Sequence, residues 1–201
     1  MAQVKTCDLV ETEQKPPEGE TGGAQEGVSV PTLRRAVHRA RILRDIKLRA
    51  NEVSATIVIA PDGFGKTTLL CQRVAEVQRD SSRGVARMID AAGMDGEELY
   101  GLLGELEMHL DARLRPLVAI DNLPTLHGAA LEGVAGRMRS LHRRGFEFLL
   151  ACLPGNRAFA NGMGDAYKVT PQALVVRPRE YSDWTRMLGI SGELDGSDLT
   201  Q

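Results

Sequence analysis

From residue 55 onward, two patterns of apolar residues alternate along this 201-residue chain. Short runs of apolar residues, many of them β-branched, predict strands that are buried on both faces. Between these runs, apolar residues recur every three or four positions, as on one side of a helix. The predicted strands are 55–60, 85–90, 116–121, 146–153 and 173–178, and the predicted helices are 66–78, 96–110, 128–144 and 182–188. This alternation favours an α/β fold, a three-layer α/β/α sandwich around a mainly parallel five-stranded sheet.

The two ends of the chain differ in composition from this alternating region. Residues 1–30 are rich in Pro, Gly, Gln and Glu, and we expect a disordered acidic tail, with a tethered interaction arm as the alternative. Residues 31–50 carry seven Lys and Arg residues against one Asp and predict a basic amphipathic helix. A solvated basic face is favoured there over contact with DNA or a membrane. We interpret residues 31–190 as one domain and 191–201 as a flexible C-terminal tail.

Charge and cysteine content narrow the classes of function. The formal net charge of −2 argues against a chain that wraps nucleic acid through bulk charge. No run approaches the roughly eighteen apolar residues of a membrane-spanning helix, and no apolar stretch near the N-terminus has the form of a signal peptide. The three cysteines are scattered, which fits reduced thiols, with Cys71 and Cys152 as small core residues. We therefore expect a cytoplasmic protein with no membrane contact.

The segment APDGFGKTTLL, between the first predicted strand and its helix, has the pattern of a phosphate-binding loop. Its glycines allow the backbone to approach phosphate oxygens, and the start of a helix favours an anion. Lys66 is expected to reach the β- and γ-phosphates, the Thr67 hydroxyl to bind Mg²⁺, and Thr68 to donate to the α-phosphate. A chance G-K-T is disfavoured because strand, loop and helix agree. The predicted nucleotide-binding residues are Ala60, Pro61, Asp62, Gly63, Phe64, Gly65, Lys66, Thr67 and Thr68.

The third predicted strand, LVAID, ends in an acid that is expected to complete the metal site. Asp121 would bind Mg²⁺ through water, opposite Thr67. One whole strand lies between the loop strand and this one in chain order, which suggests the P-loop ATPases in which a second acid, directly after the first, polarises the attacking water. Here that residue is Asn122, whose amide orients water but cannot accept its proton. ATP binding is therefore expected to survive better than hydrolysis.

The loop resembles that of the large ATP-dependent LuxR-type transcriptional regulators related to the maltose regulator, which belong to the STAND class of P-loop ATPases. Those proteins typically read A-P-x-G-[YF]-G-K-T-T-L-L, so Ala60 is shared with them. The resemblance covers residues 31–190 and extends to four further segments, PTLRRAVHRARIL, MIDAAGMDGEELYGLL, LVAIDNLPTL and FLLACLPGNRAFANG. It implies a P-loop NTPase fold and an ATP-binding module of such a regulator.

Three positions depart from that family's pattern. Asp62 is unusual, and its charge beside the phosphates should weaken binding unless the side chain turns to solvent. Asn122 replaces the second acid. The family's γ-phosphate-sensing arginine on the fourth strand is not aligned, and Arg157, a few residues later, is its substitute. Because the chain ends at Gln201, we expect no room for the family's helix-turn-helix, and its action on DNA is not carried over.

Three hypotheses for function follow. The first, which we adopt, is an ATP- and Mg²⁺-binding regulatory module, a nucleotide-dependent switch with weak or absent hydrolysis that alters a contact with another protein. The second is an active ATPase or small phosphotransferase, for which Arg157, Asp165 and Lys168 stand in a stretch better interpreted as a flexible, Gly-rich surface loop. The third is an ATP-dependent DNA-binding helper that uses the basic helix 31–49, so nucleic acid is a possible but not favoured partner.

Overall fold

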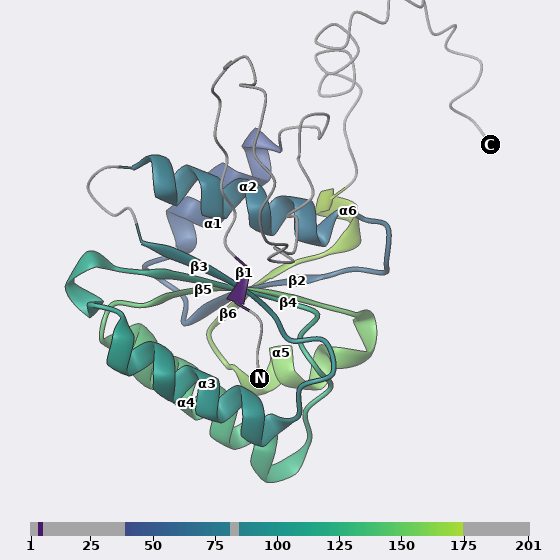
Figure 1. Cartoon of the computed structure of the whole chain (residues 1–201). Helices are drawn as coiled ribbons and strands as arrows, with labels where there is room; N and C mark the ends of the chain where they lie inside the picture. The colour runs from purple at the N-terminus through teal and green to yellow at the C-terminus, as the bar shows by residue number, and fades with distance from the viewer. Residues whose placement is uncertain (1–3, 6–38, 81–84, 175–201) are drawn as a thin grey trace, which may run out of the picture.

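One sheet forms the middle layer of the molecule, and helices cover both of its faces (Figure 1). The structure is a computed structural model that describes residues 4–5, 39–80 and 85–174. The strands lie in the order β1-β3-β4-β5-β2-β6, and every neighbouring pair is parallel except β1 with β3. The strands are β1 (Val4–Lys5), β2 (Ala55–Ile59), β3 (Ala86–Asp90), β4 (Leu117–Asp121), β5 (Glu147–Cys152) and β6 (Ala166–Val169). The predicted three-layer sandwich around five parallel strands is confirmed, with the short antiparallel β1 added at one edge.

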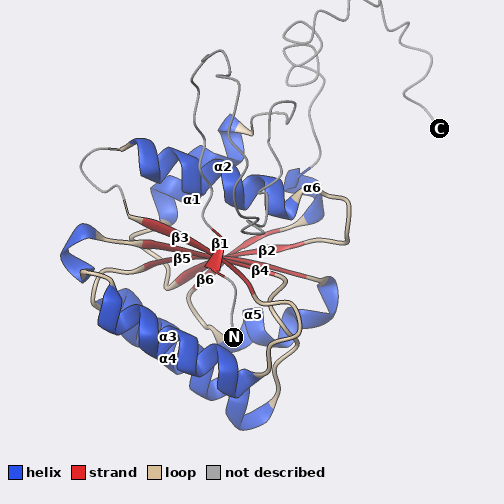
Figure 2. Cartoon of the chain, in the orientation of Figure 1, coloured by secondary structure: helices blue, strands red, loops and turns tan. Residues whose placement is uncertain are grey.

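The helices divide into two groups, one on each side of the sheet (Figure 2). One layer consists of α1 (Ala40–Arg49), α2 (Lys66–Arg79) and α6 (Pro171–Leu174). The other consists of α3 (Gly96–His109), α4 (Gly128–Arg143) and α5 (Arg157–Gly162). Short 3₁₀ turns, η1 (Ala112–Leu114) and η2 (Pro154–Asn156), precede β4 and α5. None of the described helices is long and apolar enough to span a membrane.

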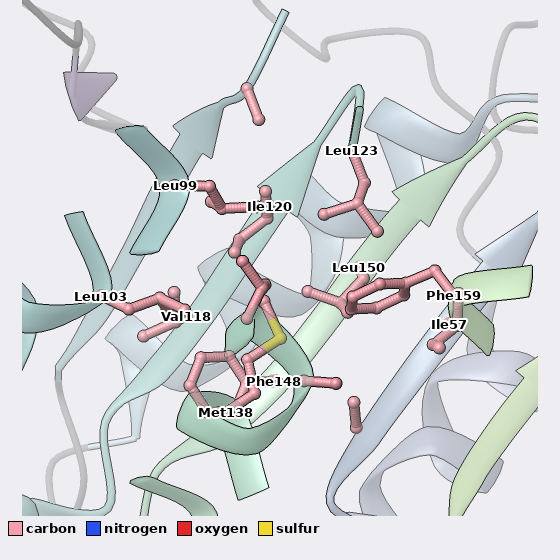
Figure 3. Close-up of a cluster of buried hydrophobic side chains, with 14 of the residues drawn as sticks. Ile57, Leu99, Leu103, Val118, Ile120, Leu123, Met138, Phe148, Leu150 and Phe159 are labelled. Atoms are coloured by element: carbon pink, nitrogen blue, oxygen red, sulfur yellow. The ribbon is translucent and has the colours of Figure 1, made fainter. Parts of the chain in front are cut away.

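The central strands are buried along their whole length because helices cover both of their faces. Every residue of β2, β4 and β5 is buried. Alternate side chains face opposite helix layers, as the pleat of a strand requires. On the side of α3, α4 and α5, strand and helix side chains pack into one cluster (Figure 3) that includes Ile57, Leu99, Leu103, Val118, Ile120, Met138, Leu150 and Phe159. On the other side, Val58, Ala119 and Leu149 pack against α1 and α2.

In the sheet, β2, which leads into the predicted phosphate-binding loop, is not a neighbour of β4, which ends in Asp121. In chain order β3 lies between β2 and β4, as the spacing predicts. In space the strand between them is β5, which pairs with β2 on one side and with β4 on the other. The carboxyl ends of all three strands therefore meet at one edge of the sheet, next to the loop that follows β2.

Three expectations from the sequence are wrong in the described part of the chain. The last parallel strand is β6, and Ala173 and Leu174, predicted as strand, lie in α6, because a short apolar run does not distinguish strand from helix. The stretch 154–168 is not a flexible loop, because it forms η2, α5 and most of β6, with Phe159 buried. Within the predicted tail, Val4–Lys5 pairs with β3.

Other expectations concern residues outside the described ranges. They are the remainder of the acidic tail, the first part of the basic helix, the helix 182–188 and the C-terminal tail 191–201.

Gly145 follows α4 in a left-handed conformation that glycine adopts without strain. Its φ is 111°, and its N–H donates to the carbonyl of His142 at 2.8 Å, while the N–H of Phe146 donates to that of Leu141 at 3.2 Å. These two bonds form a Schellman motif. A methyl group on Gly145 would lie 2.8 Å from the carbonyl oxygen of Ala112.

We predict that Gly145→Ala lowers the free energy of unfolding by at least about 1–2 kcal/mol, because of the positive φ and the clash with backbone. Gly101→Ala is the matched control, since Gly101 is exposed in α3 and a methyl group added there would meet only open space. It should raise stability by roughly 0.5–1 kcal/mol. Urea denaturation measures both, and equal effects of the two substitutions would contradict the assignment.

Candidate functional site

The loop between β2 and α2 makes turns that glycine adopts without strain. Gly63 has a φ of 82° and Gly65 a φ of 72°, both in the left-handed region. Gly65 is also the N-cap of α2, and as a glycine it has no side chain to cap the N–H groups of the first turn. Free N–H groups and the positive end of the helix dipole together favour a bound anion. The backbone of this loop is therefore suited to phosphate.

Lys66 begins α2, and its side chain lies against the loop. It is only 7% exposed, and its Nζ donates to the carbonyl oxygen of Pro61 at 3.0 Å and to Oδ1 of Asp62 at 3.2 Å. The Asp62 side chain is 87% exposed, so it faces solvent while one of its oxygens reaches the lysine. Because its carboxylate is in solvent, this ion pair contributes only about 0–1 kcal/mol. A phosphate group that binds Lys66 has to replace this pair, at modest cost.

Thr67 and Asp121 meet across the carboxyl edge of the sheet. The Thr67 Oγ1 donates to Oδ2 of Asp121 at 2.5 Å. Asp121 is 4% exposed, and its Oδ1 accepts the backbone N–H of Asn122 at 3.0 Å. The structure thus brings together the hydroxyl and the carboxylate that the sequence predicts as Mg²⁺ ligands. Thr68 follows in the first turn of α2 and is half-buried.

Asn122 turns away from the ladder at the end of β4 and contacts the neighbouring strand. Its φ is 52°, a left-handed conformation that asparagine tolerates better than most residues. Its Nδ2 donates to Oδ1 of Asp90, the last residue of β3, at 2.8 Å. The same Asp90 oxygen accepts the N–H of Ala92 at 3.1 Å. Sequence reasoning missed Asp90, although VARMID and LVAID, successive predicted strands, both end in aspartate.

Arg39, directly before α1, holds the phosphate loop from outside. Its Nη2 donates to the carbonyl oxygen of Phe64 at 3.0 Å, and a methyl group on Gly65 would come within 2.8 Å of that nitrogen. Arg41 donates from Nη2 to the carbonyl oxygen of Ala173 at 2.9 Å. The interpretation of the basic helix as a solvated face is therefore wrong for these two arginines, which bind backbone of the same domain.

Asn156 links the segment after β5 to the segment that follows Asn122. It is 2% exposed, and its Nδ2 donates to the carbonyl oxygens of Leu123 at 2.8 Å and Pro124 at 2.7 Å. The N–H of Leu123 in turn donates to the carbonyl of Ala151 at 2.9 Å. The chain just beyond the β4 end is thus fixed to the end of β5.

The three residues considered for a substrate site do not gather at the loop. Arg157 is exposed at the start of α5 and makes no hydrogen bond or ion pair with the described residues. Asp165 accepts a hydrogen bond from Ser54 Oγ at 2.5 Å. Asp165 directly precedes β6 and Ser54 directly precedes β2, so both lie at the amino edge of the sheet, opposite the loop. Burial acts to raise the pKa of Asp165, but the hydrogen bonds that it accepts hold the pKa below its ordinary value. Lys168 donates to Asn161 at 2.7 Å.

The two described cysteines are core residues, as expected from the sequence. Cys71 and Cys152 are both buried. Burial raises the pKa of the Cys152 thiol to about 11, although the positive charge of Lys66 acts in the opposite direction. A thiol with this pKa stays protonated near neutral pH, so it is a poor nucleophile. Cys7 lies outside the described residues.

No protein-family model matches the sequence, and a search of curated proteins found no match. The AMPPCP-bound DnaA from Aquifex aeolicus is 11% identical, over 78% of this chain and 54% of that one, with a TM-score of 0.49. The Walker-type ATPase paby2304 of Pyrococcus abyssi is 14% identical, over 78% and 60%, with a TM-score of 0.48. PCH-2 of C. elegans is 15% identical, over 65% and 41%, with a TM-score of 0.43. The chain therefore spans between 41% and 60% of these three chains.

The topology of this chain, taken by itself, is that of a P-loop domain. A glycine-bearing loop joins a buried parallel strand to the N-terminus of a helix, and one strand separates it from the strand that ends in the acid. Lysine and threonine follow the loop directly, and the threonine reaches the acid. The chain has the P-loop NTPase fold.

We predict that Asp62→Asn tightens ATP binding by about two- to fivefold, because it removes an exposed competitor for Lys66 and a negative charge beside the phosphates. The gain should shrink at high salt, which screens exposed charges. Glu105→Gln, the same loss of charge at an exposed position of α3, should leave affinity unchanged. Calorimetric titration measures the dissociation constants. Weaker binding by Asp62→Asn would show instead that the carboxylate supports the loop.

Proposed function

We propose that this domain binds ATP with Mg²⁺ and acts as a nucleotide-dependent switch with slow hydrolysis that changes a contact with another protein. The observation that carries the proposal is the convergence of Lys66, Thr67 and Asp121 at one edge of the sheet. A buried cation, a hydroxyl and a carboxylate at the N-terminus of a helix are the groups that a magnesium–triphosphate complex requires.

The phosphate part of the proposal rests on Lys66 and on the start of α2. Lys66 is already desolvated, and its present partners are a carbonyl oxygen and an exposed carboxylate. Phosphate oxygens offer the ammonium group stronger, charge-assisted hydrogen bonds than a carbonyl oxygen does. The glycine N-cap leaves the first N–H groups of α2 for the same ligand.

Thr67 and Asp121 fit a magnesium ion. Mg²⁺ prefers oxygen ligands and keeps several of its waters, so one hydroxyl and one nearby carboxylate suffice beside the phosphates. The two oxygens are 2.5 Å apart, close enough to serve one cation. Bound there, Mg²⁺ would neutralise phosphate charge, and the protein would supply Thr67 as a ligand and Asp121 as an acceptor for its waters.

Slow hydrolysis is proposed because of the residue that follows Asp121. Asn122 has no group that accepts a proton from water at neutral pH, and its amide nitrogen is engaged with Asp90. A site that binds nucleotide well and cleaves it slowly keeps the ATP-bound state populated for long enough to signal. The signal would pass to a protein partner, in line with the sequence resemblance to ATPase domains of LuxR-type regulators.

The other two hypotheses receive less support from the described residues. A phosphotransferase needs substrate-binding groups near the loop, but Asp165 lies at the opposite edge of the sheet, and Arg157 makes no hydrogen bond or ion pair with the described residues. A DNA-binding role for the basic helix has fewer available cations, because Arg39 and Arg41 bind backbone within the domain. Arg157, exposed at the start of α5, stays a proposed γ-phosphate sensor.

We predict that Mg-ATP raises the melting temperature by roughly 5–10 °C at a hundredfold excess over the dissociation constant. Lys66→Ala should abolish this shift, because the buried ammonium group is lost. Lys47→Ala, on the exposed side of α1, should retain it. Differential scanning calorimetry with and without Mg-ATP measures the shift. A wild-type protein without any shift, or a Lys66→Ala variant with the full one, would refute the proposed nucleotide site.

A further inference from the structure

Two neighbouring strands end in aspartates that lie side by side. Asp90, the last residue of β3, is in register with Asp121, the last residue of β4. Neighbouring strands are about 4.8 Å apart, so Asp90 is one strand spacing from the acid proposed to hold the metal's waters. The N–H of Ala91 donates to the carbonyl of Asp121 at 2.9 Å, which keeps the two strand ends together.

Asn122 joins Asp90 to the site through its side chain. Asparagine and aspartate have nearly the same shape, so the Nδ2 of Asn122 marks where an aspartate at 122 would place an oxygen. The Oδ1 of Asp90 lies 2.8 Å from that nitrogen. A carboxylate is therefore present within one hydrogen-bond length of the position where the second acid would stand, but it comes from β3.

We propose that Asp90 is the general base of this site, positioned by Asn122, and that it replaces the acid absent from position 122. This inference rests on the proposed function, because it requires ATP to bind at the loop. In the reaction, the oxygen of a water bonds to the γ-phosphorus, and the bond from that phosphorus to the β–γ bridging oxygen breaks. ADP leaves with that electron pair, one water proton passes to the Asp90 carboxylate, and the other stays on the phosphate.

Asp90 and Asn122 have different roles in activating the water. Asp90 Oδ1 is held by two N–H donors, those of Asn122 and Ala92, so the carboxylate has a defined orientation. Asn122 cannot take the proton, but its carbonyl oxygen is free of the bond to Asp90 and is an acceptor for water. Turnover is slow because the base acts from a neighbouring strand and not from the position next to Asp121.

The first test replaces only the proton acceptor. In Asp90→Asn the amide oxygen can still accept from Asn122 and Ala92, so the fold and the strand ends are kept. We expect the single-turnover rate of ATP hydrolysis to fall at least about tenfold, with unchanged ATP affinity and melting temperature. Glu105→Gln is the control for the loss of one charge.

The second test exchanges the pair. Asp90→Asn combined with Asn122→Asp keeps one carboxylate and one amide in contact and moves the acid next to Asp121. We expect this double variant to hydrolyse ATP at least as fast as the wild type. Asn122→Asp alone should be slower than the double variant, because three carboxylates at 90, 121 and 122 repel one another.

The outcomes separate this inference from the proposed function. An Asp90→Asn variant that binds and hydrolyses ATP like the wild type overturns the role of Asp90 and leaves the nucleotide site intact. A double variant that hydrolyses ATP no faster than Asp90→Asn overturns it too. If Asp90→Asn is unstable, the comparison of the double variant with the wild type is the deciding test. Wild-type turnover no higher than that of Lys66→Ala also overturns it. Absence of ATP binding in the calorimeter overturns both proposals.

Discussion

The hydrogen bond between Thr67 and Asp121 is the contact on which the rest of the site depends. It connects the first turn of α2 to the end of β4, although β5 lies between β4 and the strand that leads into the loop. Two strand spacings amount to about 10 Å, a distance that no side chain of β2 covers. The loop and the start of α2 bridge it, so the site exists only when all three strands are parallel and in this order.

Polar groups at this edge are already paired with one another in the protein alone. Lys66 binds Pro61 and Asp62, Thr67 binds Asp121, and Asn122 binds Asp90. A nucleotide that binds here therefore replaces existing hydrogen bonds with new ones. Its binding free energy depends on the difference in free energy between the bonds formed and the bonds lost. The pair with the exposed Asp62 is the weakest of them, while the Thr67 hydroxyl and the N–H of Asn122 keep the Asp121 carboxylate oriented. The site is therefore pre-organised except at Asp62, whose side chain is exposed.

The helix that carries the site is also anchored away from it. Arg73, in the middle of α2, forms a buried ion pair with Glu147 at the start of β5, with Nη2 and Oε1 3.0 Å apart. Such pairs contribute little net stability compared with apolar residues, but loss of one partner typically costs about 3–5 kcal/mol. The pair therefore fixes α2 against β5. Rearrangement on nucleotide binding is then expected in the loop 60–65 and in the side chains around it.

The sequence by itself determined those elements of this protein whose formation depends on residues close together along the chain. Continuous apolar runs predicted the buried strands β2, β4 and β5, and the spacing of Gly63, Gly65 and Lys66 predicted the loop and the helix start, because these patterns are local. Only the tertiary structure decided that β5 lies between β2 and β4, that β6 is the last strand, and that Asp90 contacts Asn122. Strand neighbours and side-chain partners distant in sequence are set by packing of the whole sheet, which no local period encodes. The polar residues that complete the site came from β3 and from the segment before α1 for that reason.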